Sequence, residues 1–160
     1  DLNTAKEVIT PKERINSLDL SPDGSKLIGA GAKGNLYVWD VRNNYAETVY
    51  KLGTKAVTAV AFSPDGRKMA AGMLDGQVKI LNSSGTVTNN LSGHASEIEH
   101  IKFNFKGDKI ASASKDYTIR LWNATNFSEQ PIKLSDHDWV WNVAFMPDGE
   151  QLIAGIQSVK

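Results

Sequence analysis

Residues 57–66, Val-Thr-Ala-Val-Ala-Phe-Ser-Pro-Asp-Gly, decide the fold because they join an apolar run directly to a tight-turn motif. The run from Val57 to Phe62 is rich in residues that favour β-strands. In the turn, proline sets the first corner and glycine supplies the positive φ that ends it. A strand that is apolar on both faces belongs to a sheet that is covered on both sides. This stretch therefore predicts a short, doubly covered strand that ends in a tight turn.

The same turn recurs along the chain at a nearly constant spacing of 42, 41 and 42 positions. The four copies are Pro22-Asp23-Gly24, Pro64-Asp65-Gly66, Phe105-Lys106-Gly107 and Pro147-Asp148-Gly149. A second series with this period is Trp39, Leu81 and Trp122, and a third is Leu20, Phe62, Phe103 and Phe145. Three series with one period indicate an internal repeat. We expect units at approximately residues 11–52, 53–91, 92–134 and 135–160, the last of them truncated.

Each unit is predicted to hold short antiparallel strands, and no window of the sequence carries a convincing helical stripe. In the second unit we expect strands at residues 57–62, 68–72, 77–81 and 86–91. In the third unit we expect them at residues 98–103, 109–114, 118–122 and 130–134. Small sheets with two apolar faces must stack on one another, and a radial stack of four-stranded blades fits a repeat of about forty residues.

Several short motifs of this sequence resemble those of a known protein family. Gly93-His94 and Leu121-Trp122-Asn123, with Asp116 between them, resemble the signature of the WD-repeat β-propeller family. The Ser-Pro-Asp-Gly turns at 21–24 and 63–66 are similar to those of many bacterial WD-repeat proteins. The resemblance implies an all-β fold of about four blades, with a ring that is incomplete within this chain. It leaves the function open, because such folds host many roles.

The resemblance also implies a structural network of four side chains in the third unit, namely His94, Ser112, Asp116 and Trp122. Physical chemistry supports such a network, since a buried carboxylate must be hydrogen-bonded and an imidazole, a hydroxyl and an indole can supply the bonds. A Ser-His-Asp catalytic triad is the rival interpretation, but it requires an accessible serine. The other units depart from the pattern: the first has Gly29 in the serine position, and the second has Ala71 and Leu81 in the serine and tryptophan positions.

Two further motifs are weak. Gly29 to Gly34 match the GxGxxG pattern, but a dinucleotide site needs a helix after the glycines, and Leu36 to Trp39 are predicted to form a strand. Asp136-His137-Asp138 could suggest a metal site, but neighbouring residues of an extended strand point to opposite sides. We therefore expect no catalytic residue, no metal and no cofactor.

Loop residues on one rim of the disc are candidates for contacts with a partner. They are Lys33, Lys55, Leu74, Glu97 and Lys115. Trp139 and Trp141 are added because tryptophan is enriched at binding hot spots. These two residues are expected to share a strand face with Val143, so that they either pack between blades or form an exposed anchor.

Composition narrows the class of partner. Eighteen Lys and Arg balance eighteen Asp and Glu, which gives no net charge and makes nucleic acid an unexpected partner. No apolar run approaches the roughly 20 residues that span a bilayer, so no membrane contact is expected. The absence of cysteine excludes disulfides and thiolate chemistry and fits the cytoplasm.

The expected function is a non-catalytic scaffold for protein–protein interaction, as part of a larger protein. The chain starts at Asp1, and Ala5 to Ile9 are expected to form the outer strand of a preceding blade, so the sequence is interpreted as a piece of a longer one. Open blade edges would then favour self-association. Two alternatives stay open: a propeller enzyme with a site near the central channel, and a sensory or regulatory segment of a signalling ATPase.

Overall fold

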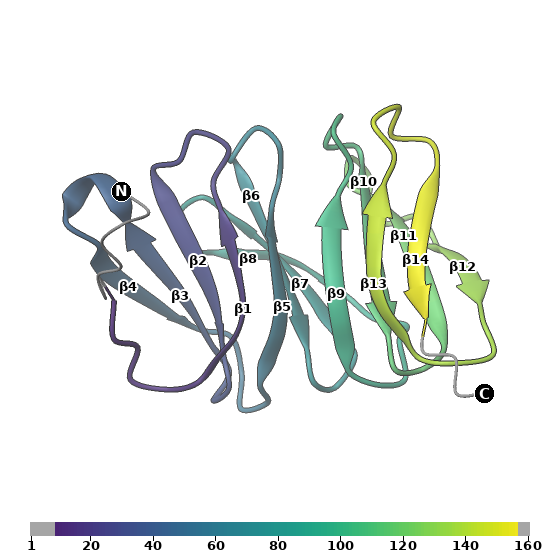
Figure 1. Ribbon diagram of the computed structural model, residues 1–160, viewed down its shortest axis with the longest axis horizontal. Helices are drawn as coiled ribbons and strands as arrows, with labels where there is room; N and C mark the ends of the chain where they lie inside the picture. Colours follow the sequence, from purple (N-terminus) through teal and green to yellow (C-terminus); the bar gives the residue numbers. More distant parts are fainter. Residues whose placement is uncertain (1–8, 157–160) are drawn as a thin grey trace, which may run out of the picture.

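The computed structural model describes residues 9–156, and these form a stack of antiparallel sheets with their first strands side by side (Figure 1). The predicted all-β propeller-like fold is confirmed. The predicted outer strand at Ala5 to Ile9 lies outside the described residues except for Ile9, which is not in a strand. Among the described residues, no helix has the length and hydrophobicity to cross a bilayer.

Three sheets have four strands in chain order, and a fourth has two. The first sheet contains β1 (Ile15–Leu20), β2 (Lys26–Gly31), β3 (Asn35–Asp40) and β4 (Ala46–Lys51). The second contains β5 (Val57–Phe62), β6 (Lys68–Met73), β7 (Val78–Asn82) and β8 (Val87–Leu91). The third contains β9 (Ile98–Phe103), β10 (Lys109–Ser114), β11 (Thr118–Asn123) and β12 (Ile132–Ser135). The fourth contains β13 (Val140–Phe145) and β14 (Leu152–Ile156).

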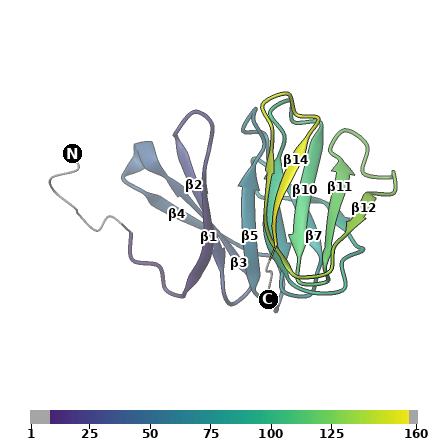
Figure 2. The same ribbon diagram turned by 45° about the vertical axis from the view of Figure 1, so that its right-hand side comes forward.

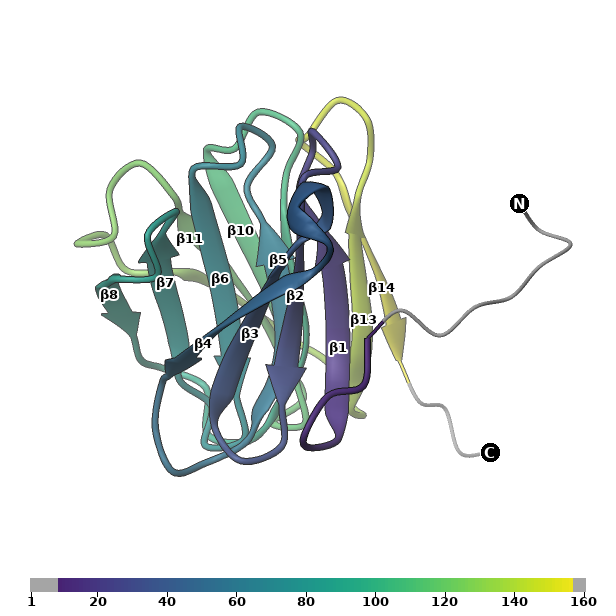
Figure 3. The same cartoon turned by 90° about the vertical axis from the view of Figure 1, so that its left-hand side faces the viewer.

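A short 3-10 helix, η1 (Val41–Asn43), forms part of the connection between β3 and β4. The Asp40 side chain caps it by accepting hydrogen bonds from the backbone N–H groups of Arg42 and Asn43. The first sheet is seen from its outer strand β4 to its inner strand β1 in Figure 3. Figure 2 shows the third sheet from β10 to its outer strand β12.

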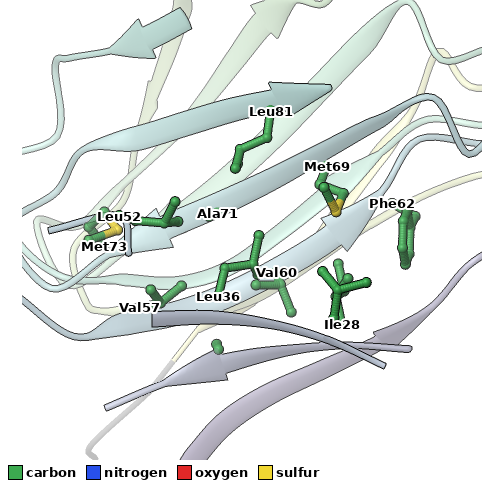
Figure 4. Close-up of a cluster of buried hydrophobic side chains, with 12 residues drawn as sticks. Ile28, Leu36, Leu52, Val57, Val60, Phe62, Met69, Ala71, Met73 and Leu81 are labelled. Carbon is green, nitrogen blue, oxygen red and sulfur yellow. The ribbon is translucent and has the colours of Figure 1, made fainter. Parts of the chain in front are cut away.

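The hydrophobic core lies between neighbouring sheets rather than inside any one of them. Between the first and second sheets, side chains from β2 and β3 meet those from β5 and β6 (Figure 4). Ile28, Leu36, Val57 and Met69 are fully buried there. Two similar clusters lie between the second and third sheets and between the third and fourth. Burial of apolar surface between neighbouring sheets is therefore the main force that holds the stack together.

The outer strands do not follow the prediction of two covered faces. Every residue of β12 is exposed, and β4 is exposed at five of its six positions. An outer strand of a radial stack lies where the sheets diverge, so less of it can be covered by a neighbour. The doubly covered pattern is correct for inner strands with a sheet on each side, such as β6 and β10, and it fails for β1 and β14 in the two end sheets.

Polar side chains on one first strand bond to the first strand of the next sheet. The Asn16 amide donates to the Val57 carbonyl at 2.7 Å, and the Thr58 hydroxyl donates to the Ile98 carbonyl at 2.6 Å. These two residues occupy equivalent β-bulges, where the register of each first strand shifts by one residue. The equivalent bulges of β9 and β13 hold Glu99 and Trp141. In the first two sheets, the bulge thus directs one side chain toward the next sheet.

Candidate functional site

The structure brings His94, Ser112, Asp116 and Trp122 together in the third sheet. His94 Nδ1 lies 2.9 Å from Asp116 Oδ2, and His94 Nε2 lies 2.8 Å from Ser112 Oγ. The Trp122 indole N–H donates to the same Ser112 oxygen at 2.9 Å. The network joins the loop before β9, the turn between β10 and β11, and the strand β11. It fixes the positions of these three segments relative to one another.

Two partners of this network are absent from the sequence-based expectation. The Thr118 hydroxyl donates to Asp116 Oδ1 at 2.6 Å and lies 3.1 Å from His94 Nδ1, and the backbone N–H of Ala95 donates to Asp116 Oδ2 at 2.9 Å. The signal for Thr118 was the Asp-x-Thr spacing, in which a threonine bonds to an aspartate two residues earlier. Ala95 contributes only its backbone, so no sequence signal could identify it.

One protonation pattern satisfies every member of the network. A proton on Nδ1 of His94 points to Asp116, which leaves Nε2 to accept from the Ser112 hydroxyl. Burial lowers the pKa of the His94 imidazole, with a smaller contribution from Arg120, and outweighs the opposite effect of Asp116. For Asp116, burial acts to raise the pKa, but hydrogen bonds from Thr118, Ala95 and His94 lower it overall. The stable state is a neutral imidazole beside a carboxylate.

The order of contacts resembles that of a catalytic triad, but the burial argues against catalysis. Ser112 has 0% of its surface exposed, and its oxygen is already engaged by Trp122. A nucleophile must be reached by its substrate. The arrangement therefore stabilises the sheet, and it offers no accessible reactive atom.

The first sheet uses a different group to link the same segments. The Glu13 carboxylate, just before β1, accepts hydrogen bonds from the Asn35 amide at 2.5 Å, the Tyr37 hydroxyl at 2.9 Å and the backbone N–H of Lys33. Burial opposes the shift, but these hydrogen bonds lower the pKa of Glu13. No sequence motif indicated Glu13, because the family's network has a histidine in this connection.

The second and fourth units have no comparable network in the part of the chain that the structure describes. Asp75 accepts one local bond, from the backbone N–H of Gln77 at 3.3 Å. Ala71 and Leu81 fill the remaining space as buried apolar groups. Asp136, His137 and Asp138 lie in a loop rather than a strand, where the first two are exposed and Asp138 is half-buried.

The connecting segments that carry six of the seven candidate rim residues lie along one edge, at the bottom of Figure 1, and the seventh, Trp141, is in β13. We call it the lower edge and define it by the connecting segments 32–34, 52–56, 74–77, 92–97, 115–117 and 136–139. Backbone hydrogen bonds join neighbouring segments: Leu74 N–H donates to the Ala56 carbonyl at 3.0 Å, and Lys115 N–H donates to the Glu97 carbonyl at 3.1 Å. Such bonds link segments 32–34, 52–56 and 74–77 to one another, and they likewise link segments 92–97, 115–117 and 136–139.

Four of the seven candidate rim residues meet at one place, together with Glu99. The Lys115 ammonium lies 2.5 Å from Glu97 Oε2 and 2.8 Å from Glu99 Oε1. It also lies 5.8 Å from the ring centre of Trp139 and 5.6 Å from that of Trp141. Hydrogen bonds to Glu97 and then Glu99 raise the pKa of Lys115. We call these five residues the Lys115 cluster.

The two tryptophans do not lie as the sequence predicted. Trp139 precedes β13, and the bulge at Trp141 shifts the register before Val143. Val143 is consequently buried, whereas Trp139 and Trp141 are 37% and 40% exposed. Simple alternation failed here because a bulge places an extra residue in one strand. The indole rings pack edge to face, with their centres 5.7 Å apart.

The other three candidate rim residues lie elsewhere on the lower edge. Lys33 and Lys55 are exposed in the connections within and after the first sheet, and Leu74 is exposed at the β6–β7 connection. Sequence reasoning missed Glu99, which the bulge of β9 turns toward Lys115. A bulge position carried by a charged residue is the only signal that could have found it.

Two other features are an ion pair between inner strands and a groove between sheets. Asp19 of β1 and Lys102 of β9 form an ion pair at 3.6 Å that links the first and third sheets along their inner strands. A groove of about 390 Å³ lies between the third and fourth sheets and includes Trp122, Phe145 and Glu150 in its lining. Within residues 9–156, no three His, Asp or Glu side chains gather as a metal site would require.

Comparison with known proteins identifies the repeat. A family model described as "Nucleolar protein 10-like, N-terminal domain" matches residues 3–157. Periodic tryptophan protein 2 of Arabidopsis thaliana is 29% identical over 143 residues, which cover 86% of this chain and 16% of that protein. Polyadenylation factor subunit 2 of Candida albicans is 27% identical over 119 residues, covering 74% and 22%. A Drosophila pseudoobscura LST8 homolog is 26% identical over 139 residues, covering 81% and 44%.

These matches correct the prediction of a bacterial-type repeat and show how much of each relative the chain covers. The Ser-Pro-Asp-Gly turns led to a prediction of a bacterial-type repeat, which is wrong, because the relatives are eukaryotic proteins. The turn reflects the geometry that proline and glycine provide and is no marker of lineage. The chain also spans less than half the length of each of these relatives.

Proposed function

Because this chain belongs to the family of nucleolar protein 10-like N-terminal β-propeller domains, we propose that it is a non-catalytic platform on which other proteins assemble. The observation that carries the proposal is the lower edge, where connected loops on a rigid stack present exposed charged and aromatic side chains. Loops held by a rigid scaffold are the usual place for binding.

The names of the relatives support a role in an assembly. One relative is named as a subunit of a polyadenylation factor, and the family description names a nucleolar protein. We propose an assembly that handles RNA, in which this chain contacts proteins. The absence of net charge supports protein rather than nucleic acid as its direct partner.

The proposal is tested by placing matched substitutions on the two edges of the stack. Leu74→Asp and Lys55→Glu change exposed residues of the lower edge. Phe105→Asp and Arg67→Glu change an exposed apolar and an exposed basic residue of the opposite edge. Proteins that co-purify with the full-length protein are quantified by mass spectrometry. We expect the lower-edge variants to lose specific partners and the others to keep them; equal loss on both edges contradicts the proposal.

Self-association is a second proposal, and it rests on the edge of the fourth sheet. Within the described residues, β14 pairs with β13 on one side only, and Ile153 is 59% exposed. An unpaired edge with exposed apolar side chains can recruit a strand from a second copy. Light scattering of the full-length protein over a range of concentrations tests this. A mass that stays monomeric throughout would contradict it.

The predicted cytoplasmic location remains a proposal. The absence of cysteine fits any reducing compartment, and the family description favours the nucleolus as the alternative. Imaging of a fluorescent fusion of the full-length protein distinguishes the two.

A further inference from the structure

The bulge position changes its role along the stack. In the first two sheets it holds Asn16 and Thr58, and each donates a hydrogen bond to the next sheet. In the third sheet it holds Glu99, whose carboxylate cannot donate such a bond. Glu99 instead turns to Lys115, and the fourth bulge places Trp141 beside the same lysine. The bulge position therefore links neighbouring sheets in the first two sheets and contributes to a charged and aromatic cluster in the other two.

This cluster has the composition of a cation-binding site. Two indole faces lie within 6 Å of one ammonium group, and two carboxylates flank it. Cations are attracted to indole faces by the ring quadrupole. Two carboxylates against one lysine leave a net negative charge, and Asp136 and Asp138 in the adjacent loop add to it. Lys115 thus occupies, from within the chain, a place that an external cation would fit.

Resting on the function proposed above, we propose that the Lys115 cluster binds an arginine side chain of a basic peptide segment in a protein partner, which displaces Lys115. A guanidinium is planar, stacks on aromatic rings and bonds to carboxylates in a bidentate manner. It therefore exploits both the tryptophans and the two glutamates better than an ammonium does. The partial exposure of Trp139 and Trp141 leaves the rings accessible to it.

Charge distinguishes this occupant from RNA. Exposed tryptophans can also stack on nucleic-acid bases. A phosphate backbone approaching these rings, however, would meet Glu97, Glu99 and Asp138, and like charges repel. The observations therefore favour a basic peptide.

The test uses the full-length protein and two capped peptides, Gly-Arg-Gly-Arg-Gly and the same peptide with citrulline for arginine. Citrulline keeps the shape but removes the charge. Binding is measured by calorimetry and by the quenching of tryptophan fluorescence. We expect the citrulline peptide to bind about tenfold more weakly, because it loses the cation–π contact and the ion pairs.

Variants separate displacement of Lys115 from a purely structural role. Lys115→Met removes the internal competitor, so it should tighten binding of the arginine peptide several-fold. Trp141→Ala and Trp139→Ala should weaken it. Lys106→Met is the control, since Lys106 pairs with Glu150 on the opposite edge, and it should leave binding unchanged. Trp141→Phe keeps an aromatic ring at this position and is the folding control for Trp141→Ala. Circular dichroism checks that each variant is folded.

Three results would overturn the proposal: equal affinity for both peptides, weaker or unchanged binding in Lys115→Met, or saturable binding of oligouridine that the tryptophan variants abolish. Should the peptides fail while Leu74→Asp still loses its partners, this inference falls and the proposed function stands. Failure of both experiments removes the proposed function as well.

Discussion

The imidazole of His94 and the carboxylate of Asp116 lie 2.9 Å apart, although 22 positions separate them in the chain. Their contact is the centre of a network that includes Ser112, Thr118 and Trp122. It ties a connection between sheets to a turn within a sheet, and its largely buried position makes each missing partner costly.

Asp116→Ala should destabilise the protein far more than Asp75→Ala. The first change leaves the imidazole, the Thr118 hydroxyl and the Ala95 N–H without their acceptor, at a cost of about 1–3 kcal/mol. The second removes one bond in an exposed turn and should stay within about 0.5 kcal/mol. Midpoints of urea unfolding measure both. An equal or reversed order would show that the network is not a source of stability.

Acid should weaken the fold as the pH falls below the ordinary pKa of histidine. Burial lowers the pKa of His94 and of His100, where Lys102 adds to the effect, below the ordinary value of 6.5. The unfolded chain then binds more protons than the folded chain, so the stability present above pH 6.5 is lost as the pH falls below it. The lowered pKa of Asp116 adds a loss of the same sign below its ordinary value of 3.8.

The measurement is the unfolding midpoint between pH 7.5 and 5. It should decrease in the unmodified protein, and the decrease should be smaller in the His94→Gln, His100→Gln double variant. His137→Gln, in an exposed loop, is the control and should keep the full decrease. A midpoint that does not change with pH in the unmodified protein would contradict the assignment of neutral, buried imidazoles.

Gly29→Ala should destabilise the first sheet because the tryptophan of that sheet lies against the glycine. A Cβ atom at Gly29 would come within 2.7 Å of the Trp39 ring, which is buried. Overpacking of this kind costs about 1–3 kcal/mol. Gly53→Ala is the matched control, because its nearest neighbour would be the Met73 methyl at 3.8 Å. Thermal unfolding compares them, and equal stability of the two variants would contradict the packing.

Glu13→Ala tests whether the Glu13 carboxylate stabilises the first sheet, which lacks the histidine network. The Tyr37 hydroxyl and the Asn35 amide would lose their acceptor, and Tyr37 is buried, so a cost of about 1–3 kcal/mol is expected. Glu129→Ala, whose bonds lie in an exposed turn, should be nearly neutral. Urea midpoints measure both; a neutral Glu13→Ala would remove Glu13 from the account.

The sequence predicted the sheets well because the signals that define them are local. Turn residues and β-branched runs recur with one period, so strands such as Val57–Phe62 and Ile98–Phe103 match their predicted bounds. Contacts between side chains that lie far apart in the sequence were not predictable in this way. Glu13 replaces a histidine from a different position, and Glu99 and Trp141 owe their directions to bulges that depend on the partner strand. Neither the replacement by Glu13 nor the bulges can be predicted from the composition.

The lower edge of the stack is the surface that we propose binds proteins. Cross-linking of the full-length protein, purified with its native partners, tests it most directly with a lysine-reactive reagent and mass spectrometry. The account predicts intermolecular cross-links from Lys33 and Lys55, which are exposed on the lower edge, and few from Lys106 on the opposite one. Cross-links that arise mainly from Lys106 would contradict it.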